Sequence, residues 1–239
     1  MVARLGRVQA VEARWTSVIS VIIPVLREAD NISTLRQLMQ LLRSVDAEII
    51  VVDGGSNDGT QDLVRSFTDQ LINAPQGRAR QMNAGAEAAS GEFLLFLHAD
   101  SILSKEEIDQ AIDKIENSEW GRFDLRINNS HYLYRVIEYM INMRSRITGI
   151  ATGDQAIFVR KNLFNDIGQF ADIPLMEDVE ICRRLKKRAR PVCLKQKVVT
   201  SARYWEKHGP FISILRMWRI RFAYWMGVSP KLLHGRYYR

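Results

Sequence analysis

The segment 48–60, EIIVVDGGSNDGT, constrains the fold of this chain more than any other. Residues 48–52 form a short run rich in β-branched side chains, which is typical of a strand buried on both faces of a sheet. The run ends at Asp53-Gly54-Gly55, where two glycines let the backbone turn sharply and approach a ligand closely. Ligands of open α/β sheets bind beyond the carboxyl ends of the strands, so Asp53 is a candidate ligand contact.

Two roles for Asp53 remain open from the sequence. Its carboxylate can cap the turn through the amides of Ser56 and Asn57, or it can hydrogen-bond a nucleobase or ribose. The glycine spacing does not match the G-x-G-x-x-G dinucleotide motif, and no Gly-Lys-Ser/Thr of a P-loop follows.

Residues 17–118 alternate between strand and helix patterns with short connections. We expect Pro24 to end the first strand, Asp30 or Asn31 to cap the first helix, and Ser104 to cap the fourth. This alternation predicts an α/β fold with a doubly wound, mostly parallel sheet and helices on both faces. The predicted strands are 17–24, 48–52, 71–72 and 92–97, and the predicted helices are about 30–43, 60–67, 78–89 and 105–116.

The pattern changes after residue 118, although no linker separates the two parts. We therefore predict one domain over 1–239, with a nucleotide-binding half (17–118), a mixed acceptor and catalytic half (119–205), and an amphipathic basic C-terminal helix and tail (206–239). Residues 1–16 resemble a polar leader. In the second half we expect strands at 121–128, 156–161 and 192–203, and helices at 131–147 and about 178–188.

Charge and composition limit the partners and the location. The net charge is +7, which favours anionic partners, but no nucleic-acid motif is present. Two cysteines give no disulfide framework, and neither a signal peptide nor about 18 consecutive apolar residues can be found. We expect a cytoplasmic protein, either free or attached to the inner face of the cell membrane.

The predicted C-terminal helix has an aromatic face bordered by arginines. Such a helix fits a membrane interface, but it also fits a cover for the protein's own core or for the partner in a homodimer. The sequence leaves these alternatives open. The face contains Phe211, Ile214, Leu215, Trp218, Phe222, Trp225 and Met226, and Arg216, Arg219 and Arg221 lie beside it.

A second strand end, FLLFLHADS at 93–101, brings His98 and Asp100 to the same edge of the sheet. A hard divalent cation binds one or two protein carboxylates together with substrate phosphates, so Asp100 is a candidate metal ligand. Capping of the next helix through the amides of Ser101 and Ile102 is the alternative. The start of the helix at 78–89 is a candidate anion site with two arginines, Arg78 and Arg80, of which one is expected to face inward and the other to lie at the surface.

Two polar clusters flank the strand at 156–161. They are Gly153-Asp154-Gln155 and Glu177-Asp178. An acid pair beside apolar side chains can raise the pKa of one carboxylate, which suits a general base. Helix capping by Asp178 is compatible with that role.

Six segments in this order resemble the inverting family 2 glycosyltransferases of GT-A fold, over about residues 17–205. The chain is most similar to a small bacterial subgroup with His-Ala-Asp in place of the usual Asp-x-Asp. The segments are SVIIPVLREADNI, IIVVDGGSNDGT, GRARQMNAGA, LLFLHADS, GDQAIFVRK and MEDVEICRRL.

The resemblance implies a role for each candidate residue. His98 replaces the first Asp of the motif, which leaves open whether it contacts the ribose or the metal. The Gln-x-x-Arg-Trp segment of processive synthases is absent, with residues 201–205 only loosely similar, so polymerisation is not expected. The implied roles are nucleotide binding by Pro24, Glu28, Asp53, Gly54, Arg78, His98 and Ala99; Mg²⁺ or Mn²⁺ binding by Asp100; acceptor binding by Gly153, Asp154, Gln155 and Glu177; and catalysis by Asp178 as the base.

The implied reaction moves a sugar from a UDP- or GDP-sugar to a hydroxyl acceptor, perhaps lipid-linked, with inversion at the anomeric carbon. A nucleotidyltransferase is one alternative, but such enzymes carry a Gly-rich loop with a lysine after the first strand, and residues 24–31 have neither. A non-catalytic membrane-surface protein on the same fold is the other alternative.

Overall fold

The computed structural model describes residues 19–237, so the leader and the first two residues of the predicted first strand lie outside the described residues. The strands are β1 (Ile19–Val25), β2 (Glu48–Asp53), β3 (Gln70–Asn73), β4 (Phe93–Phe96), β5 (Trp120–Ile127), β6 (Ile157–Arg160) and β7 (Val192–Thr200). The α-helices are α2 (Ile32–Ser44), α3 (Thr60–Val64), α4 (Arg78–Ala88), α5 (Lys105–Glu116), α6 (Tyr132–Thr148), α7 (Lys161–Asp166), α8 (Glu177–Leu185), α9 (Arg203–His208), α10 (Pro210–Trp225) and α11 (Pro230–Tyr237). Three 3₁₀ turns are η1 (Ala29–Asn31), η2 (Arg65–Phe67) and η3 (Gly153–Gln155).

The seven strands form one mostly parallel sheet in the order β3-β2-β1-β4-β6-β5-β7. Strand β6 runs antiparallel to both of its neighbours, β4 and β5, and the other pairs are parallel. The predicted fold class is therefore confirmed. The single reversed strand accounts for the mixed pattern of the second half.

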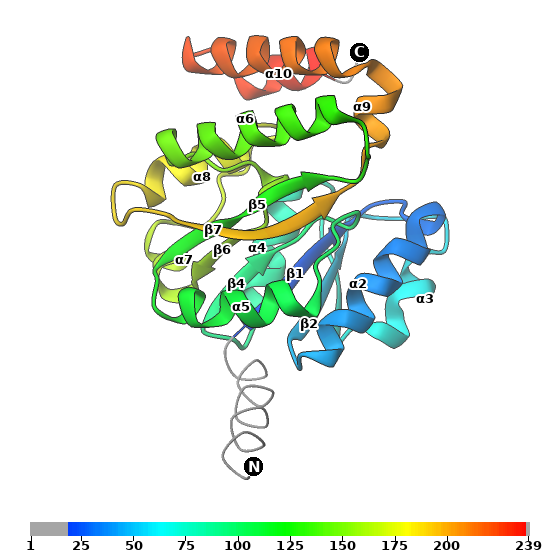
Figure 1. The fold of residues 1–239 in the computed structure, drawn as a ribbon. Helices are drawn as coiled ribbons and strands as arrows, with labels where there is room; N and C mark the ends of the chain where they lie inside the picture. The colour runs from blue at the N-terminus through cyan, green and yellow to red at the C-terminus, as the bar shows by residue number, and fades with distance from the viewer. Residues whose placement is uncertain (1–18, 238–239) are drawn as a thin grey trace.

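Helices cover both faces of the sheet (Figure 1). Apolar side chains of α2 and α5 pack on one face, and those of α4, α7 and α8 pack on the other. A third, smaller cluster joins the far end of β5 to α6, α9 and α10. This cluster holds α6 and α10 together as an outer layer above the sheet.

Two local predictions near β1 are wrong. Pro24 does not end the strand, which continues to Val25 and pairs with β2 throughout. Its missing N–H costs no ladder bond, because this side of β1 faces β4 and that pairing has already ended at Ile22. Asn31 precedes α2 but makes no capping bond; its amide reaches the Ala99 carbonyl instead. The Ser104 cap of α5 is confirmed: its Oγ accepts from the Glu107 amide, and the Glu107 carboxylate accepts from the Ser104 amide.

The C-terminal segment forms three helices rather than one helix and a tail. In α10 only Ser213 and Ile220 are buried. The predicted aromatic face is largely exposed, with Phe211 at 73% and Trp225 at 68% of their full accessible surface. Covering its own core is therefore not the main role of this face. No helix within residues 19–237 combines the length and apolarity needed to cross a membrane.

Candidate active site

A cleft of about 580 Å³ opens at the carboxyl ends of β1 and β4. The start of α4 forms one wall, and the segment before α8 forms another. Six of the predicted site residues line this cleft, so the sheet brings together two strand ends that are about 75 residues apart in the sequence. They are Pro24, Glu28, Arg78, His98, Ala99 and Asp100.

Asp53 and Gly54 lie beneath this cleft rather than on its lining. The side chain of Asp53 is fully buried, and its Oδ2 accepts hydrogen bonds from the amides of Gly55 and Ser56 and from Gln61. The turn-capping role is thus present, with Gly55 in place of the expected Asn57. Burial alone would raise the pKa of Asp53, but these hydrogen bonds lower it below its usual value. Its Oδ1 is buried with no partner among the described residues.

Gln81 of α4 is a supporting residue that the sequence reasoning missed. Its amide donates to the carbonyls of Val25 and Val52, at the point where β1 and β2 separate. A Cβ at Gly54 would stand only 3.0 Å from its Oε1, so a larger residue at position 54 would require the Gln81 side chain to shift. The signal available in the sequence was a glutamine next to the apolar Met82 in the predicted helix 78–89.

Arg203 and His234 also line the cleft and were not predicted. Arg203 begins α9 within the segment judged only loosely similar to a synthase motif, and its charge lowers the pKa of Glu28. Burial nevertheless leaves the pKa of Glu28 raised, with Asp100 adding to the effect. No motif marked His234, which reaches the cleft because α11 folds back. Arg80 points outward to Asp172, as expected for the surface arginine.

His98 lines both the cleft and a second, much smaller cavity of about 10 Å³, which Gly153, Glu177 and Asp178 also line. Burial, together with the charge of the nearby Arg78, lowers the pKa of His98 to about 3, so its ring is neutral near pH 7. The ring lies against the η3 turn. A Cβ on Gly153 would stand only 2.6 Å from its Nε2.

Asp178 faces this turn from the start of α8. Its Oδ2 accepts from the Gly153 amide at 3.0 Å, and its Oδ1 accepts from the Val179 amide at 2.7 Å. Burial raises its pKa to about 6, and the adjacent Glu177 adds to the rise, although the two amides and Arg78 oppose it. Capping and a raised pKa therefore coexist at this side chain, and a carboxylate with such a pKa suits a general base near neutral pH.

Burial also raises the pKa of Asp154, with Asp178 contributing. Its Oδ1 is shielded from solvent and lacks a hydrogen-bond partner within the described part of the chain. Residues with positive φ angles stand beside both acids: Ala156 at +50° follows Asp154, and Met176 at +71° precedes Asp178. Such angles are strained for residues other than glycine, which is typical of functional sites.

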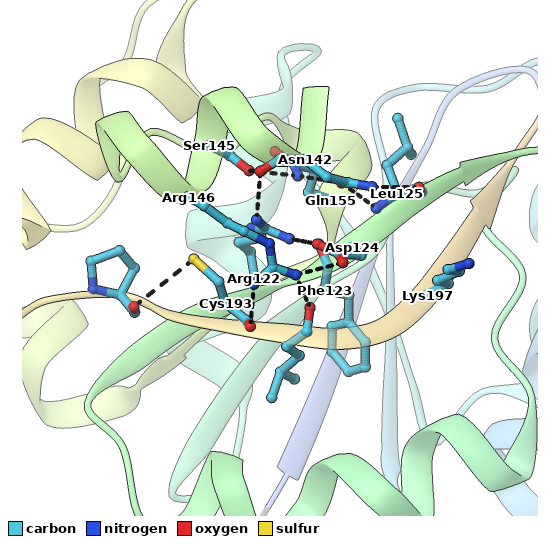
Figure 2. Close-up of polar contacts among 12 residues, drawn as sticks. Arg122, Phe123, Asp124, Leu125, Asn142, Ser145, Arg146, Gln155, Cys193 and Lys197 are labelled. Atoms are coloured by element: carbon cyan, nitrogen blue, oxygen red, sulfur yellow. Dashed lines mark hydrogen bonds and ion pairs between the residues drawn. The ribbon is translucent and has the colours of Figure 1, made fainter. Parts of the chain in front are cut away.

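A buried polar network fixes the η3 turn from below (Figure 2). The Gln155 amide donates to Ser145 Oγ at 3.1 Å and Asn142 Oδ1 at 3.3 Å, both on α6. Asn142 in turn exchanges hydrogen bonds with the backbone of Leu125 on β5. Gln155 is fully buried and lines none of the cavities described above, so we revise its expected role from acceptor contact to positioning of the turn.

Comparisons with known proteins identify the family of the chain. The model of the family described as "Glycosyl transferase family 2" matches residues 20–168, well over half of the chain. The chain belongs to glycosyl transferase family 2.

Two relatives from the same comparisons are similar over part of their length. This family 2 chain is 28% identical over 169 residues to "Glycosyltransferase AglE" of Haloferax volcanii, covering 64% of this chain and 55% of the relative. It is 28% identical over 155 residues to an "Undecaprenyl-phosphate 4-deoxy-4-formamido-L-arabinose transferase" of Yersinia enterocolitica, covering 59% and 47%. The chain therefore spans about half the length of these relatives.

Two solved structures share the fold. A mannosyltransferase from Pyrobaculum calidifontis, in complex with GDP-Man and Mn²⁺, has a TM-score of 0.62 and 18% identity, covering 93% of this chain and 68% of that one. TarS 1–349 of S. aureus, in complex with UDP-GlcNAc, has a TM-score of 0.61 and 23% identity, covering 77% and 58%. The fold of this family 2 chain is the expected GT-A fold.

The cleft of this family 2 chain offers few protein ligands for a metal ion. No group of three His, Cys, Asp or Glu side chains suited to a metal occurs within residues 19–237. Asp100 and Glu28 are the carboxylates of the cleft lining. Mg²⁺ and similar hard cations keep one or two carboxylates and complete their shell with substrate phosphates and water. The donor set therefore fits a metal that binds together with a diphosphate.

Replacing Gly153 with Ala should destabilise this family 2 chain, because the added Cβ would collide with the buried His98 ring. Overpacking of this kind costs about 1–3 kcal/mol. We expect thermal melting to fall by several degrees, whereas Gly235→Ala, whose Cβ would meet no atom within 4 Å, should leave it nearly unchanged. Equal melting temperatures for the two variants would contradict the close contact.

Proposed function

We propose that the protein is a metal-dependent inverting glycosyltransferase that moves a sugar from a nucleotide-diphosphate sugar to a hydroxyl acceptor. The observation that carries the proposal is the placement of Asp178. Its carboxylate has a pKa of about 6 and adjoins a polar cleft through the shared residue His98. A general base next to a site for an anionic donor is what direct sugar transfer requires.

The donor binds in the cleft, with its diphosphate near Arg78 and Arg203. A UDP- or GDP-sugar is supported by the complexes of the structural neighbours with UDP-GlcNAc and GDP-Man. The nucleobase or ribose lies toward Pro24, Glu28, His98 and the buried Asp53. The unpartnered Oδ1 of Asp53 would gain a donor from a nucleoside N–H or O–H, which would remove the cost of leaving it unpaired.

Asp100 would hold Mg²⁺ or Mn²⁺ together with the diphosphate of the donor. Mn²⁺ in the Pyrobaculum calidifontis complex supports this assignment. When bound, the cation stabilises negative charge that develops on the leaving diphosphate. Arg78 contributes to the same stabilisation from the start of α4.

The acceptor hydroxyl lies between Asp178 and the sugar. An alcohol has a pKa far above 7, so Asp178 takes its proton as the oxygen attacks the anomeric carbon. Attack from the face opposite the diphosphate inverts the configuration in a single displacement. Gly153, Asp154 and Glu177 border the acceptor, and Gln155 keeps the turn in position.

The pH dependence of kcat/KM tests the base. Because protonated Asp178 cannot accept a proton, kcat/KM should fall below about pH 6, by about tenfold per pH unit. The charge of Glu177 raises this pKa, so Glu177→Gln should move the acidic limb to lower pH. Rates measured between acid and neutral pH with saturating metal decide the matter. If Glu177→Gln leaves the acidic limb of the kcat/KM profile at the same pH, Asp178 is not the titrating group.

The acceptor is proposed to be lipid-linked, and the protein to be cytoplasmic and peripheral to the inner face of the membrane. The exposed aromatic face of α10 supports this assignment. The Yersinia enterocolitica relative, whose name contains undecaprenyl-phosphate, also supports it. A homodimer through the same face is the competing arrangement.

A panel of nucleotide sugars tests the proposal directly. The correct donor should raise the melting temperature only when Mg²⁺ or Mn²⁺ is present. The transfer product should have the opposite anomeric configuration to the donor, as read by NMR coupling constants. A retained configuration would exclude the single displacement, and release of pyrophosphate would indicate a nucleotidyltransferase instead.

A further inference from the structure

An apolar groove of about 450 Å³ runs between α6 and α10. Its walls carry aliphatic, thioether and aromatic side chains, and its polar residues are few. We call it the α6–α10 groove. It is lined by Ile137, Tyr139, Met140, Ile141, Met143, Arg144, Thr152, Asp154, Trp205, Ile214, Met217, Trp218 and Arg221.

The groove ends beside the proposed reaction centre. Thr152 and Asp154 line it, while Gly153, between them, lines the cavity of Asp178. The η3 turn is thus a thin partition between the groove and the general base. Asp154 and Asp178 are close enough for the charge of Asp178 to raise the pKa of Asp154. A molecule in the groove therefore has its inner end near Asp178.

Two unsatisfied polar groups meet at this inner end. Nε and one terminal nitrogen of Arg144 are shielded from solvent and have no hydrogen-bond partner among the described residues. The same holds for Oδ1 of Asp154. Buried donors and acceptors are costly when unpaired, so their occurrence in pairs at one place indicates a polar ligand group. A hydroxyl suits both, because it accepts from a guanidinium and donates to a carboxylate.

The mouth of the groove lies within a large exposed apolar surface. Large exposed apolar patches mark interaction sites on soluble proteins. On α6 the exposed apolar residues are Tyr132, Val136, Tyr139, Met140, Met143 and Ile147, and on α10 they are Phe211, Ile212, Leu215, Trp218, Phe222 and Trp225.

The charge of the chain indicates what this surface meets. Residues 203–239 contain eight Lys and Arg and one Glu, a net charge of +7, so residues 1–202 are neutral. Basic residues beside an exposed aromatic face are complementary to an anionic bilayer, where each contributes about 1 kcal/mol near the surface. A second copy of this chain would instead bring two such basic segments together.

We propose that the α6–α10 groove holds the hydrocarbon chain of an acceptor lipid with a hydroxyl-bearing head, taken from an anionic membrane on which α6 and α10 dock. The head lies at Arg144 and Asp154, and its hydroxyl reaches Asp178 past the η3 turn. This inference rests on the proposed function for its chemistry. The groove and its lipid, however, can be tested without sugar transfer.

The test compares decyl glucoside, below its micelle concentration, with methyl glucoside, which has the same head and no chain. Calorimetry should detect decyl glucoside binding and no methyl glucoside binding. Met140→Asp places a carboxylate in the groove wall and should weaken decyl glucoside binding more than about tenfold, since a charge opposes contact with hydrocarbon. Val136→Asp is the matched control: it is an exposed apolar residue of the same helix outside the groove, and its effect should stay below about twofold.

Sedimentation with vesicles tests the docking surface. The protein should bind phosphatidylglycerol vesicles at low salt and phosphatidylcholine vesicles far less, and Trp225→Asp should release it. Equal loss of decyl glucoside binding in Met140→Asp and Val136→Asp, or no binding at all, would overturn the groove assignment. If the protein forms a concentration-dependent dimer and binds neither kind of vesicle, the membrane assignment is wrong and a second copy of the chain covers this surface.

The outcomes separate this inference from the proposed function. If decyl glucoside binds but no nucleotide sugar gives metal-dependent stabilisation, the proposed glycosyltransferase function fails and the proposed lipid groove stands. Stabilisation by a nucleotide sugar without decyl glucoside binding would do the reverse.

Discussion

Asp178→Asn should lower kcat for sugar transfer by about 10²–10⁴-fold, the range that a positioned general base contributes. An asparagine has nearly the same shape, and its single carbonyl oxygen can still accept the hydrogen bond from the Gly153 amide, so the η3 turn should persist although the bond from the Val179 amide is lost. It cannot take a proton from the acceptor hydroxyl. The affinity for the nucleotide sugar, measured by thermal stabilisation, should therefore stay nearly unchanged.

Asp154→Asn is the informative comparison, because Asp154 also has a raised pKa and lies beside Asp178. We expect its main effect on KM for the acceptor rather than on kcat. If Asp154→Asn gave the larger loss of kcat, the base would be Asp154. If Asp178→Asn lost donor binding and activity together, Asp178 would have a binding or folding role.

Asp100→Ala should abolish metal-dependent donor binding. Among residues 19–237, the cleft lining has one other carboxylate, Glu28, and burial raises the pKa of that group, so it cannot easily replace Asp100. A ligand at 100 times its Kd stabilises a protein by about 2.7 kcal/mol, and this shift should disappear in the variant. Melting curves with the donor, with and without Mn²⁺, measure the effect.

Asp109→Ala is the matched control, because this exposed Asp lies on α5 and lines no part of the cleft. It should keep the full metal-dependent shift. Should Asp100→Ala keep that shift as well, the metal assignment would fail, and Glu28 would become the candidate ligand.

The parallel part of the sheet could be predicted because its strands and helices follow hydrophobic periods of two and 3.6 residues. The strand β2, for example, is buried along almost its whole length and was found within one residue. The short helix α7 escaped prediction, although the even shorter α3 did not. Helix α7 has six residues and is held by Leu163 and Phe164 in the core, so its stability comes from packing that a local pattern does not report.

The residues of the candidate site also divide into those with a local sequence signal and those placed by tertiary structure. His98 and Asp100 were found because they follow a recognisable buried strand. Arg203 and His234 were missed because they reach the cleft through the paths of α9 and α11, which depend on tertiary structure. Gln155 was expected at the acceptor, but its side chain is fully buried, since spacing along a chain does not say which side of a 3₁₀ turn faces the core.

The concentration of the net charge in residues 203–239 makes the molecule a strong electric dipole. Among the described residues, the segment 203–237 has one acidic side chain, whereas residues 19–202 carry slightly more acids than bases. In the field of a negatively charged surface, such a dipole turns before contact, so α10 and α11 arrive first. The encounter rate should then decline steeply as ionic strength rises, while transfer to a short acceptor in solution should hardly respond.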